Sequence, residues 1–335
     1  MRTSARSRLH PVICLVALLP LAAAPAAAQG PPGGGGGGSP ALTSLDFLLR
    51  QGVCRGCDFG AVDLAGVRLV SKELPGAVLN GANLSGSDLR FAILSASELE
   101  GADLSASDLS SASVTTANLR QADLHQATLG ATSFRGSDLT GANLQGANLV
   151  SAFFEGARLE GADLSDASGE VVRLLGAVLT SAILRRTALT DVACDGADFS
   201  QADLTDAALR GSFPGAGFGS CSCRANFTAA LLVRTDLSDC GFLGAFFENA
   251  NLASARAVRA NFISALFRGA NLSGMDLSEA AMNGAFLENA NLTGITCDGV
   301  LCQGAQPPGM SAAFFSNTTC PDGVTVGNSP ADCGF

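Results

Sequence analysis

Cysteines are the residues of this sequence whose number and spacing most readily suggest chemistry. The chain has 335 residues, of which eleven are cysteines and only two are histidines. Cys54 and Cys57 form a Cys-x-x-Cys motif, and Cys320 and Cys333 bracket a short C-terminal segment. Such spacings favour disulfides in an oxidising compartment. A metal site on Cys54 and Cys57 is the rival interpretation, but no second pair stands at zinc-ribbon spacing, so we expect no metal.

Acidic residues at 20-residue intervals offer a second kind of chemistry. The residues at these intervals are Asp63, Asn83, Asp103, Asp123, Asn143, Asp163 and Asp203. Stacked about 4.8 Å apart, they could bind Ca²⁺ or imitate DNA phosphates, although a solvated polar face is the simpler interpretation. His125 is the only histidine after residue 28, and no Ser-His-Asp set, nucleotide-binding loop or zinc-protease motif accompanies it. We expect no catalytic residue and no cofactor.

A five-residue repeat positions these side chains. From Phe59 to Leu209, every fifth residue is Leu or Phe, except at Val114, Gly169 and Cys194. We call this place the core position. The residue two before it, usually Ala, holds the small position, and the residue between them, often Asp or Asn, holds the polar position. A period of five fits neither a helix nor a strand, so the repeat needs a structure of its own.

A square coil satisfies this period. If each five-residue unit forms one side, four units close a turn of about 20 residues, with the core and small positions pointing inward. Successive coils would stack at the strand spacing of about 4.8 Å and bond to each other through the backbone. Residues 20 apart should then lie above one another. Phenylalanines are expected to form two such columns, Phe227–Phe247–Phe267 and Phe242–Phe262.

The unit Ala-(Asp/Asn)-Leu-x-x, sustained over residues 54–302, resembles the pentapeptide-repeat family. The resemblance implies an all-β fold, a right-handed quadrilateral parallel β-helix. The opening Cys54-Arg-Gly-Cys57-Asp58 and the tail around Cys320-Pro-Asp-Gly323 resemble those of secreted members. This resemblance implies a short N-terminal capping helix. It also implies a disulfide-linked C-terminal tail, here residues 303–335, that covers the C-terminal end of the β-helix.

Residues 41–53 are expected to form the capping helix. Ser39 is a candidate N-cap with Pro40 at the first helical position, and Gly52 is a candidate C-terminal stop. The leucines expected to share one face and to plug the first coil are Leu42, Leu45, Leu48 and Leu49.

The repeat frame breaks between residues 210 and 226. The interval from Leu209 to the next clear core residue, Phe227, is not a multiple of five. In one interpretation, Phe213, Phe218 and Cys223 take core positions, with a single-residue deletion at each end. In the other, three extra residues form a bulged loop. Either interpretation predicts a local irregularity that separates a long segment from a shorter one.

The deletion interpretation predicts a further disulfide. With one residue missing near position 224, Cys221 and Cys240 lie one coil apart at the small position, a separation that a disulfide can bridge. Cys297 and Cys302 hold successive core positions and could pair. Cys194 and Cys223 have no obvious partner.

The N-terminal residues predict export. Residues 1–28 combine three arginines, an apolar stretch and the small residues Ala26-Ala27-Ala28, as in a secretory signal, and residues 29–40 form a Gly/Pro-rich linker. Cleavage would remove three arginines and no acids, and so would change the net charge from −10 to −13. We expect a periplasmic or secreted protein, without a membrane span in the mature chain.

These features lead to two interpretations of function. The first is a non-catalytic structural or protein-interaction scaffold of the bacterial cell envelope or extracellular space, with a protein partner. The second is an acidic DNA mimic, because some cytoplasmic pentapeptide-repeat proteins protect DNA gyrase in this way. The export signal argues against the second, and net negative charge argues against nucleic acid as a partner.

Overall fold

The computed structural model describes residues 44–211, 221–296, 316–323 and 325–326. The chain divides into two compact units, residues 1–40 and 41–335, and every described residue belongs to the second. The predicted signal (1–28) and linker (29–40) lie outside the described residues.

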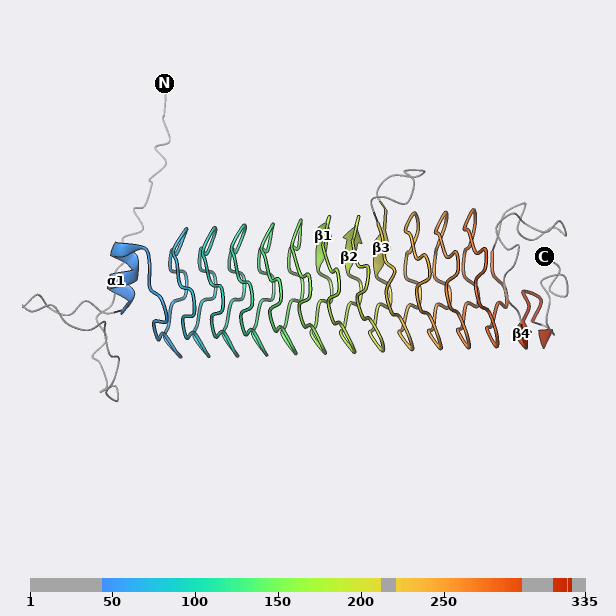
Figure 1. The fold of residues 1–335 in the computed structure, drawn as a ribbon, viewed down its shortest axis with the longest axis horizontal. Coiled ribbons are helices and arrows are strands. Elements are labelled where there is room, and N and C mark those ends of the chain that lie inside the picture. Colours follow the sequence, from blue (N-terminus) through green and yellow to red (C-terminus); the bar gives the residue numbers. More distant parts are fainter. Residues whose placement is uncertain (1–43, 212–220, 297–315, 324, 327–335) are drawn as a thin grey trace, which may run out of the picture. The chain divides into compact units, whose positions relative to one another are not determined.

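Backbone pairing with a 20-residue register builds this unit. Val53 pairs with Glu73, Asp58 with Val78, Asp63 with Asn83 and Arg68 with Asp88, all in parallel. Such bridges recur at every fifth position, so each coil contributes four bridge columns. The coils stack side by side as a β-helix solenoid (Figure 1).

Each coil bonds to the coils before and after it through its polar and core positions. The Leu84 N–H donates to the carbonyl of Asp103 on the next coil (2.6 Å), whereas the Asn83 N–H donates to that of Val62 on the preceding coil (3.0 Å). The Ala82 N–H closes the intervening turn by donating to Leu79 (3.0 Å). The Asn83 carbonyl also accepts the Leu64 N–H (2.6 Å), so the backbone of the polar residue bonds to the preceding coil, and its side chain remains at the surface.

Three coils extend their pairing into short strands. They are β1 (Ser168–Glu170), β2 (Ala188–Thr190) and β3 (Ala208–Arg210), which form a parallel sheet in the order β1-β2-β3. Their middle residues are Gly169, Leu189 and Leu209, which hold one core column. Strands β4 (Thr318–Thr319) and β5 (Thr325–Val326) pair antiparallel near the other end of this unit.

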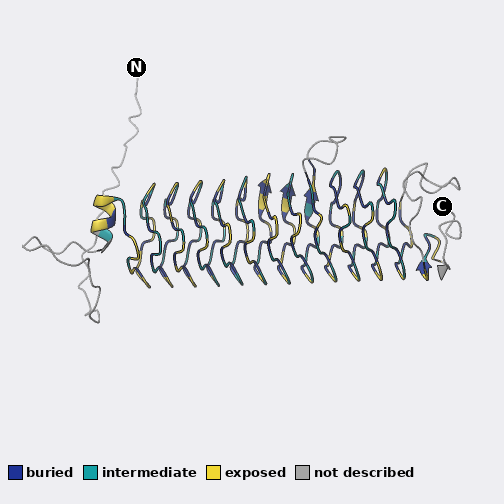
Figure 2. Cartoon of the chain, in the orientation of Figure 1, coloured by how far each residue is buried: buried dark blue, intermediate teal, exposed yellow. Residues whose placement is uncertain are grey.

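The core is the stacked interior of the coils. Leucines and phenylalanines at core positions and alanines at small positions are almost all fully buried, while the residues between them alternate outward (Figure 2). Both predicted phenylalanine columns are present, since Phe227 stacks on Phe247 and Phe247 on Phe267 at 4.9 Å between ring centroids, and Phe242 on Phe262 at 5.2 Å. Rings of the two columns meet edge to face.

Helix α1 (Ser44–Gln51) precedes the first coil, within the predicted range 41–53. Leu48 is 1% exposed and Leu45 packs against the core, as expected of a plug. Leu49 is 41% exposed, so its assignment to the buried face was wrong, and Leu42 lies outside the described residues. Gly52 ends the helix at a φ of +82°, and the Leu49 carbonyl accepts a hydrogen bond from Lys72 Nζ (2.9 Å).

The frame break differs from both predictions. Asp198 pairs with Asn226, 28 positions later, eight more than one coil. Cys223 lies directly above Cys194 and holds the one core position between Leu209 and Phe227 among the described residues. The deletion after Cys223 is therefore right, but the deletion after Leu209 and the three-residue bulge are both wrong. The predicted core residues Phe213 and Phe218 lie in 212–220, outside the described residues.

Pairing continues without interruption across this insertion. The Leu209 N–H donates to Asp236 (2.8 Å), and the Cys194 N–H donates to Ser222 (2.7 Å). The sequence cannot predict this pairing, because the length of the interval between Leu209 and Phe227 does not show how many of its residues belong to the coil.

The C-terminal segment joins the same stack. The Leu292 N–H donates to Thr319 (2.8 Å), the Gly294 N–H donates to Pro321 (2.8 Å), and Cys320 is buried above Leu292. Residues predicted as a separate tail, 303–335, thus include a piece that continues the coil pairing. Residues 297–315, with Cys297 and Cys302, lie outside the described residues.

Candidate functional site

Three disulfides join described cysteines. Cys54 bonds to Cys57 beside the first coil, with Cα atoms 5.6 Å apart. Cys221 bonds to Cys240 at 4.9 Å, and Cys194 bonds to Cys223 at 4.5 Å. No partner was predicted for Cys194 or for Cys223. Cys223 lies above Cys194 only because extra residues follow Leu209. Cys320 is also disulfide-bonded, whereas its predicted partner Cys333 lies outside the described residues.

The two internal disulfides form one buried cluster. The sulfurs of Cys221, Cys223 and Cys240 all lie within 4.8 Å of one another, and each residue is at most 1% exposed. A metal needs thiolates, and each of these sulfurs is already bonded to another sulfur. The same holds for Cys54 and Cys57, the rival metal site. The cluster therefore links three successive coils where the chain leaves the solenoid.

The acidic column lies along one line of bridges, and each of its carboxylates already accepts at least one hydrogen bond. Each residue pairs with its counterpart on the next coil, with Ile183 between Asp163 and Asp203. Asp103, Asp163 and Asp203 each accept the backbone N–H two residues later, at 2.9 to 3.0 Å. Asn83 donates to Asp63 (3.0 Å) from the neighbouring coil. The column thus closes turns and links coils.

Hydrogen bonds lower the pKa of two carboxylates in this column, Asp163 and Asp203. Burial alone would raise the pKa of Asp163, but hydrogen bonds from Ser165 and Gln145 outweigh burial and lower that pKa below its ordinary value. For Asp203, burial is likewise outweighed by the bonds from Thr205 and Arg185, so its pKa is lowered. Asp163 and Asp203 therefore act as charged hydrogen-bond acceptors.

His125 lies beside the same column, two residues after Asp123. Its Nδ1 is 3.0 Å from the Asp123 carboxylate, and its backbone N–H also donates to that carboxylate (3.0 Å). The side chain is 42% exposed, in keeping with the prediction that it faces solvent. A histidine and a carboxylate alone are not a catalytic set, and the described contacts of His125 include no nucleophile that would complete one.

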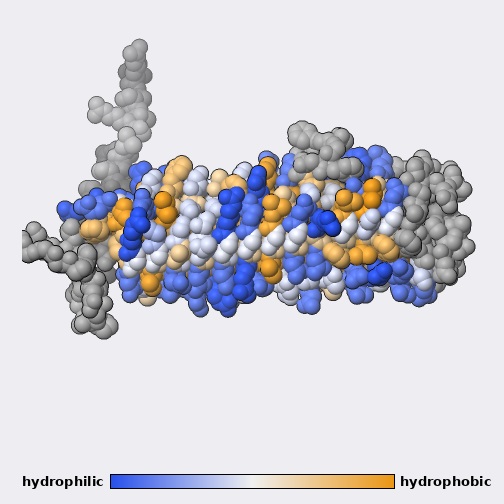
Figure 3. Space-filling model, in the orientation of Figure 1, coloured by the Kyte–Doolittle hydropathy of each residue, from blue (hydrophilic) through white to orange (hydrophobic). Residues whose placement is uncertain are grey.

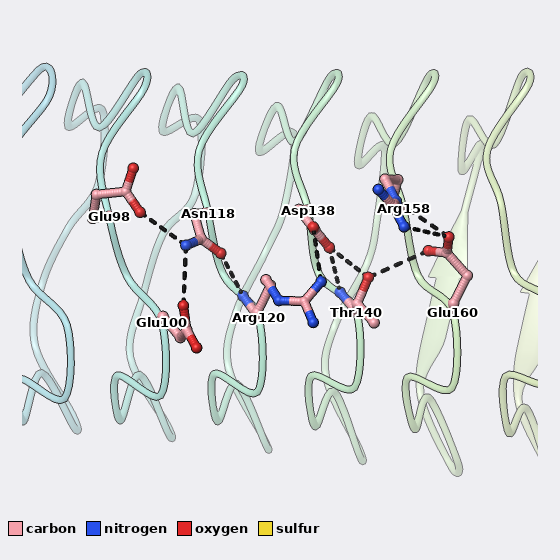
Figure 4. A network of polar contacts seen from close by, with 8 residues as sticks. All are labelled: Glu98, Glu100, Asn118, Arg120, Asp138, Thr140, Arg158 and Glu160. Atoms are coloured by element: carbon pink, nitrogen blue, oxygen red, sulfur yellow. Dashed lines mark hydrogen bonds and ion pairs between the residues drawn. The ribbon is translucent and has the colours of Figure 1, made fainter.

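A polar network crosses a second line of the coils and shows how the surface charges are used (Figure 4). Its residues are Glu98, Glu100, Asn118, Arg120, Asp138, Thr140, Arg158 and Glu160. Asn118 donates to Glu98 (2.8 Å), Arg120 to Asp138 (3.2 Å) and Arg158 to Glu160 (3.1 Å). Burial would raise the pKa of Asp138, but bonds from Thr140 and Arg120 outweigh it and lower that pKa. Asp138 and Glu160 are paired with arginines here, whereas Glu98 and Glu100 are bound by the uncharged amide of Asn118.

The family model for pentapeptide repeats matches this chain in eight copies, over residues 57–168, 182–213 and 258–294, more than half of its length. The chain belongs to the pentapeptide-repeat family. A comparison with curated protein sequences finds no match. Family membership accounts for the five-residue period and the parallel solenoid, whereas the site must be argued from this chain's own residues.

Solved structures of other pentapeptide-repeat proteins resemble this chain. HetL, from the cyanobacterium Nostoc sp. strain PCC 7120 and involved in heterocyst differentiation regulation, is 27% identical over 81% of this chain and 92% of its own, with a TM-score of 0.21. Full-length QnrB1, a plasmid-mediated fluoroquinolone resistance protein, is 17% identical over 64% and 92%, with a TM-score of 0.29. Rfr23, from the cyanobacterium Cyanothece 51142, is 27% identical over 37% and 95%, with a TM-score of 0.22.

An exposed apolar strip is the surface feature of this pentapeptide-repeat protein that the five-residue pattern did not reveal. We define it as Leu243, Phe246, Ile263, Leu266 and Phe286. Leu243 and Phe246 are 51% and 44% exposed, and the other three are half-buried. Hydrophobic patches also interrupt the hydrophilic surface that Figure 3 shows. The sequence signal that could have predicted this strip is the presence of large hydrophobic residues outside the core positions.

Among the residues that the structure describes, no helix is both long and apolar enough to cross a membrane.

Proposed function

We propose that this pentapeptide-repeat protein is an exported, non-catalytic scaffold that binds a protein partner. The apolar strip is the observation that carries this proposal. Phe246, Leu266 and Phe286 lie on three successive coils of one bridge column, and Leu243 and Ile263 lie around the adjoining turn. Exposed apolar groups in adjacent rows are typical of protein interfaces, where large apolar side chains supply most of the binding energy.

The charges around the strip suit an interface rim. Arg268 contacts Glu288 (3.2 Å) and lies 5.3 Å from the centroid of the Phe286 ring. Its guanidinium also lies 3.7 Å from the carboxylate of Glu248. Polar groups at the edge of an apolar contact surface give specificity and exclude wrong partners.

Export is supported by two features of the chain. Residues 1–28 have the composition of a secretory signal, and the described part contains three disulfides. Disulfides form and persist in oxidising compartments such as the periplasm and the extracellular space. A secreted type of pentapeptide-repeat protein, with its Cys-x-x-Cys opening and Cys-Pro-Asp-Gly tail, is therefore our proposal for this chain.

We also propose that the coil is right-handed and four-sided. Four bridge columns for each coil support four sides, and the turn after each side accounts for the five-residue period.

The acidic DNA mimic is less well supported. Such a mimic needs rows of unpaired negative charge, but Asp138, Asp163 and Asp203 all accept hydrogen bonds, and asparagines interrupt the acids along the column. Arg185 and Arg120 further reduce the field of these acids.

Capture of partners from envelope fractions tests the proposed function. The protein with Leu243→Glu and Phe246→Glu should lose a specific partner that the wild type retains. A matched control carries Val150→Glu and Val171→Glu, which lie on other coils and are 41% and 48% exposed in the wild type. Equal capture by all three proteins, or equal loss in both variants, would refute the role of the strip.

A further inference from the structure

A polar hollow lies beside the C-terminal end of β3. Its volume is about 390 Å³, within the range of small-molecule sites. The residues that line it are Thr190, Arg210, Gly211, Asp236, Ser238, Asp239, Arg256 and Arg259. They come from successive coils around the insertion, and none of them holds a core position.

Small residues lie at the base of this hollow. A side-chain carbon on Gly211 would lie 2.5 Å from the backbone oxygen of Asp239, so only glycine allows this close backbone approach without a shift. Ser238, on the next coil, is 2% exposed, whereas the equivalent position one coil later holds the larger Val258. The serine therefore occupies less of the space beneath the longer side chains than the valine does one coil later.

The hollow carries an excess of positive charge. Three arginines and two aspartates line it, on a chain whose net charge is −10. Arg259 is engaged, because it donates two hydrogen bonds to Asp239, at 2.7 and 2.8 Å. Arg210 and Arg256 instead share one oxygen of Asp236 at 3.6 and 3.7 Å.

Arg210 and Arg256 have N–H donors that their long ion-pair contacts leave unused. Their side chains are 53% and 55% exposed, and their ion pairs are all longer than a hydrogen bond, including the 4.0 Å contact between Arg256 and Asp276. A guanidinium has five N–H donors in a planar fork that matches carboxylate and phosphate oxygens. One shared carboxylate therefore leaves most of these donors available to a ligand.

Ser238 adds a donor at the floor. Its Oγ accepts the Val258 N–H (3.2 Å) and a long contact from Arg256 (3.5 Å). Within the described part of the chain, the Ser238 hydroxyl has no acceptor for its own hydrogen, which is therefore available to an oxygen placed in the hollow.

We propose that this hollow binds the oxyanion group, carboxylate or phosphate, of a small-molecule ligand. Arg210 and Arg256 would donate to its oxygens, Ser238 would donate from below, and the Arg259–Asp239 pair would hold the wall in place. Charge-assisted bonds of this type are the stronger hydrogen bonds in proteins. The site does not depend on the scaffold function, and either can fail alone.

Isothermal titration calorimetry of the full, disulfide-intact chain at low ionic strength tests this site, with inorganic phosphate and citrate as separate probes. We expect saturable binding of one equivalent of at least one probe. Arg210→Gln with Arg256→Gln should weaken it at least tenfold. The matched control is Arg135→Gln with Arg173→Gln, which removes two positive charges beside Phe153, away from the hollow, and should leave affinity within twofold.

The outcomes separate the possible ligands. Binding of phosphate alone assigns a phosphate-bearing ligand, and binding of citrate alone assigns a carboxylate. Unchanged thermal unfolding of the Arg210/Arg256 variant would show that lost affinity is not lost folding. Binding of neither probe by the wild type, or equal weakening in both double variants, would overturn the proposal.

Discussion

At the scale of single residues, inward and outward positions alternate so closely that neighbours have opposite roles. Leu174 is 2% exposed and holds a core position, whereas Leu175, the next residue, is 37% exposed. The same hydrophobic residue therefore has a structural role in one case and a surface role in the other.

Leu174→Asp should destabilise the protein severely, by about 3 kcal/mol or more, because it buries an unpaired carboxylate. The matched control, Leu175→Asp, should cost less than about 1 kcal/mol, since the new charge remains in water. Chemical unfolding of both variants measures this difference. Equal losses would contradict the register of the core positions.

The Asp203 carboxylate should make stability depend on pH. Its folded pKa lies below its ordinary value of 3.8, so the contribution is present above that value and is lost as pH falls through the folded pKa. Asp203→Asn keeps the acceptor for Thr205 but loses the charge opposite Arg185, whose side chain is 56% exposed. We expect the free energy of unfolding of the wild type to exceed that of this variant by about 0.5–1 kcal/mol at pH 7.

As the pH falls through the folded pKa of Asp203, that difference should shrink toward zero, because the protonated carboxyl resembles the amide. Unfolding free energies of both proteins at pH 7 and at the lowest pH that leaves them folded provide the measurement. A difference that is the same at both pH values would show that the charge of Asp203 does not contribute.

At the scale of elements, the five-residue period was sufficient to predict the coils but not the turns between them. The residue two after almost every core position has a positive φ, at Ala61 (+53°) and Phe91 (+60°) as at Gly66 (+66°), but not at Gly211 or Ala225 beside the insertion. Glycines at this place in many units were the available signal. Ala and Phe are rarely left-handed, and here the hydrogen bonds to the neighbouring coils hold them in that conformation.

The insertion after β3 shows why part of the fold was not predictable. Periodicity reports only residues that belong to the coil, so it cannot give the length of a segment that leaves it. Phe213 and Phe218 matched the pattern closely enough to suggest core positions, and both lie outside the described residues. Cys223 holds a core position as predicted, but the periodicity did not place it above Cys194. The Cys194–Cys223 disulfide and the hollow at Arg210 both depend on that register, so neither could be derived from the sequence.

Peptide mapping without reduction tests the register through this segment. Protein from its native compartment should give the linkages Cys194–Cys223 and Cys221–Cys240. Replacing Cys194 and Cys223 together by Ala should cost about 2–4 kcal/mol, because the linkage restricts the unfolded chain. A Cys223–Cys240 linkage, or free thiols at all four positions, would contradict the pairing of coils across the insertion.

At the scale of the whole molecule, the residues whose side chains could take part in chemistry mainly stabilise the solenoid. Disulfides link coils, carboxylates close turns, and arginines pair with acids on neighbouring coils, as Arg186 does with Asp166. What remains at the surface is an apolar strip and a polar hollow, which we propose bind other molecules. This division of roles is what we expect of an exported scaffold.

Export is the claim on which compartment, disulfides and partner all depend, and the mature N-terminus tests it most directly. N-terminal sequencing and intact-mass measurement should be made on protein recovered separately from cytoplasmic, periplasmic and medium fractions. The account predicts a chain that begins near Gln29, found in the periplasm or medium, with its disulfides formed. An uncleaved chain with free thiols, confined to the cytoplasm, would contradict the account and return the gyrase-protecting alternative to consideration.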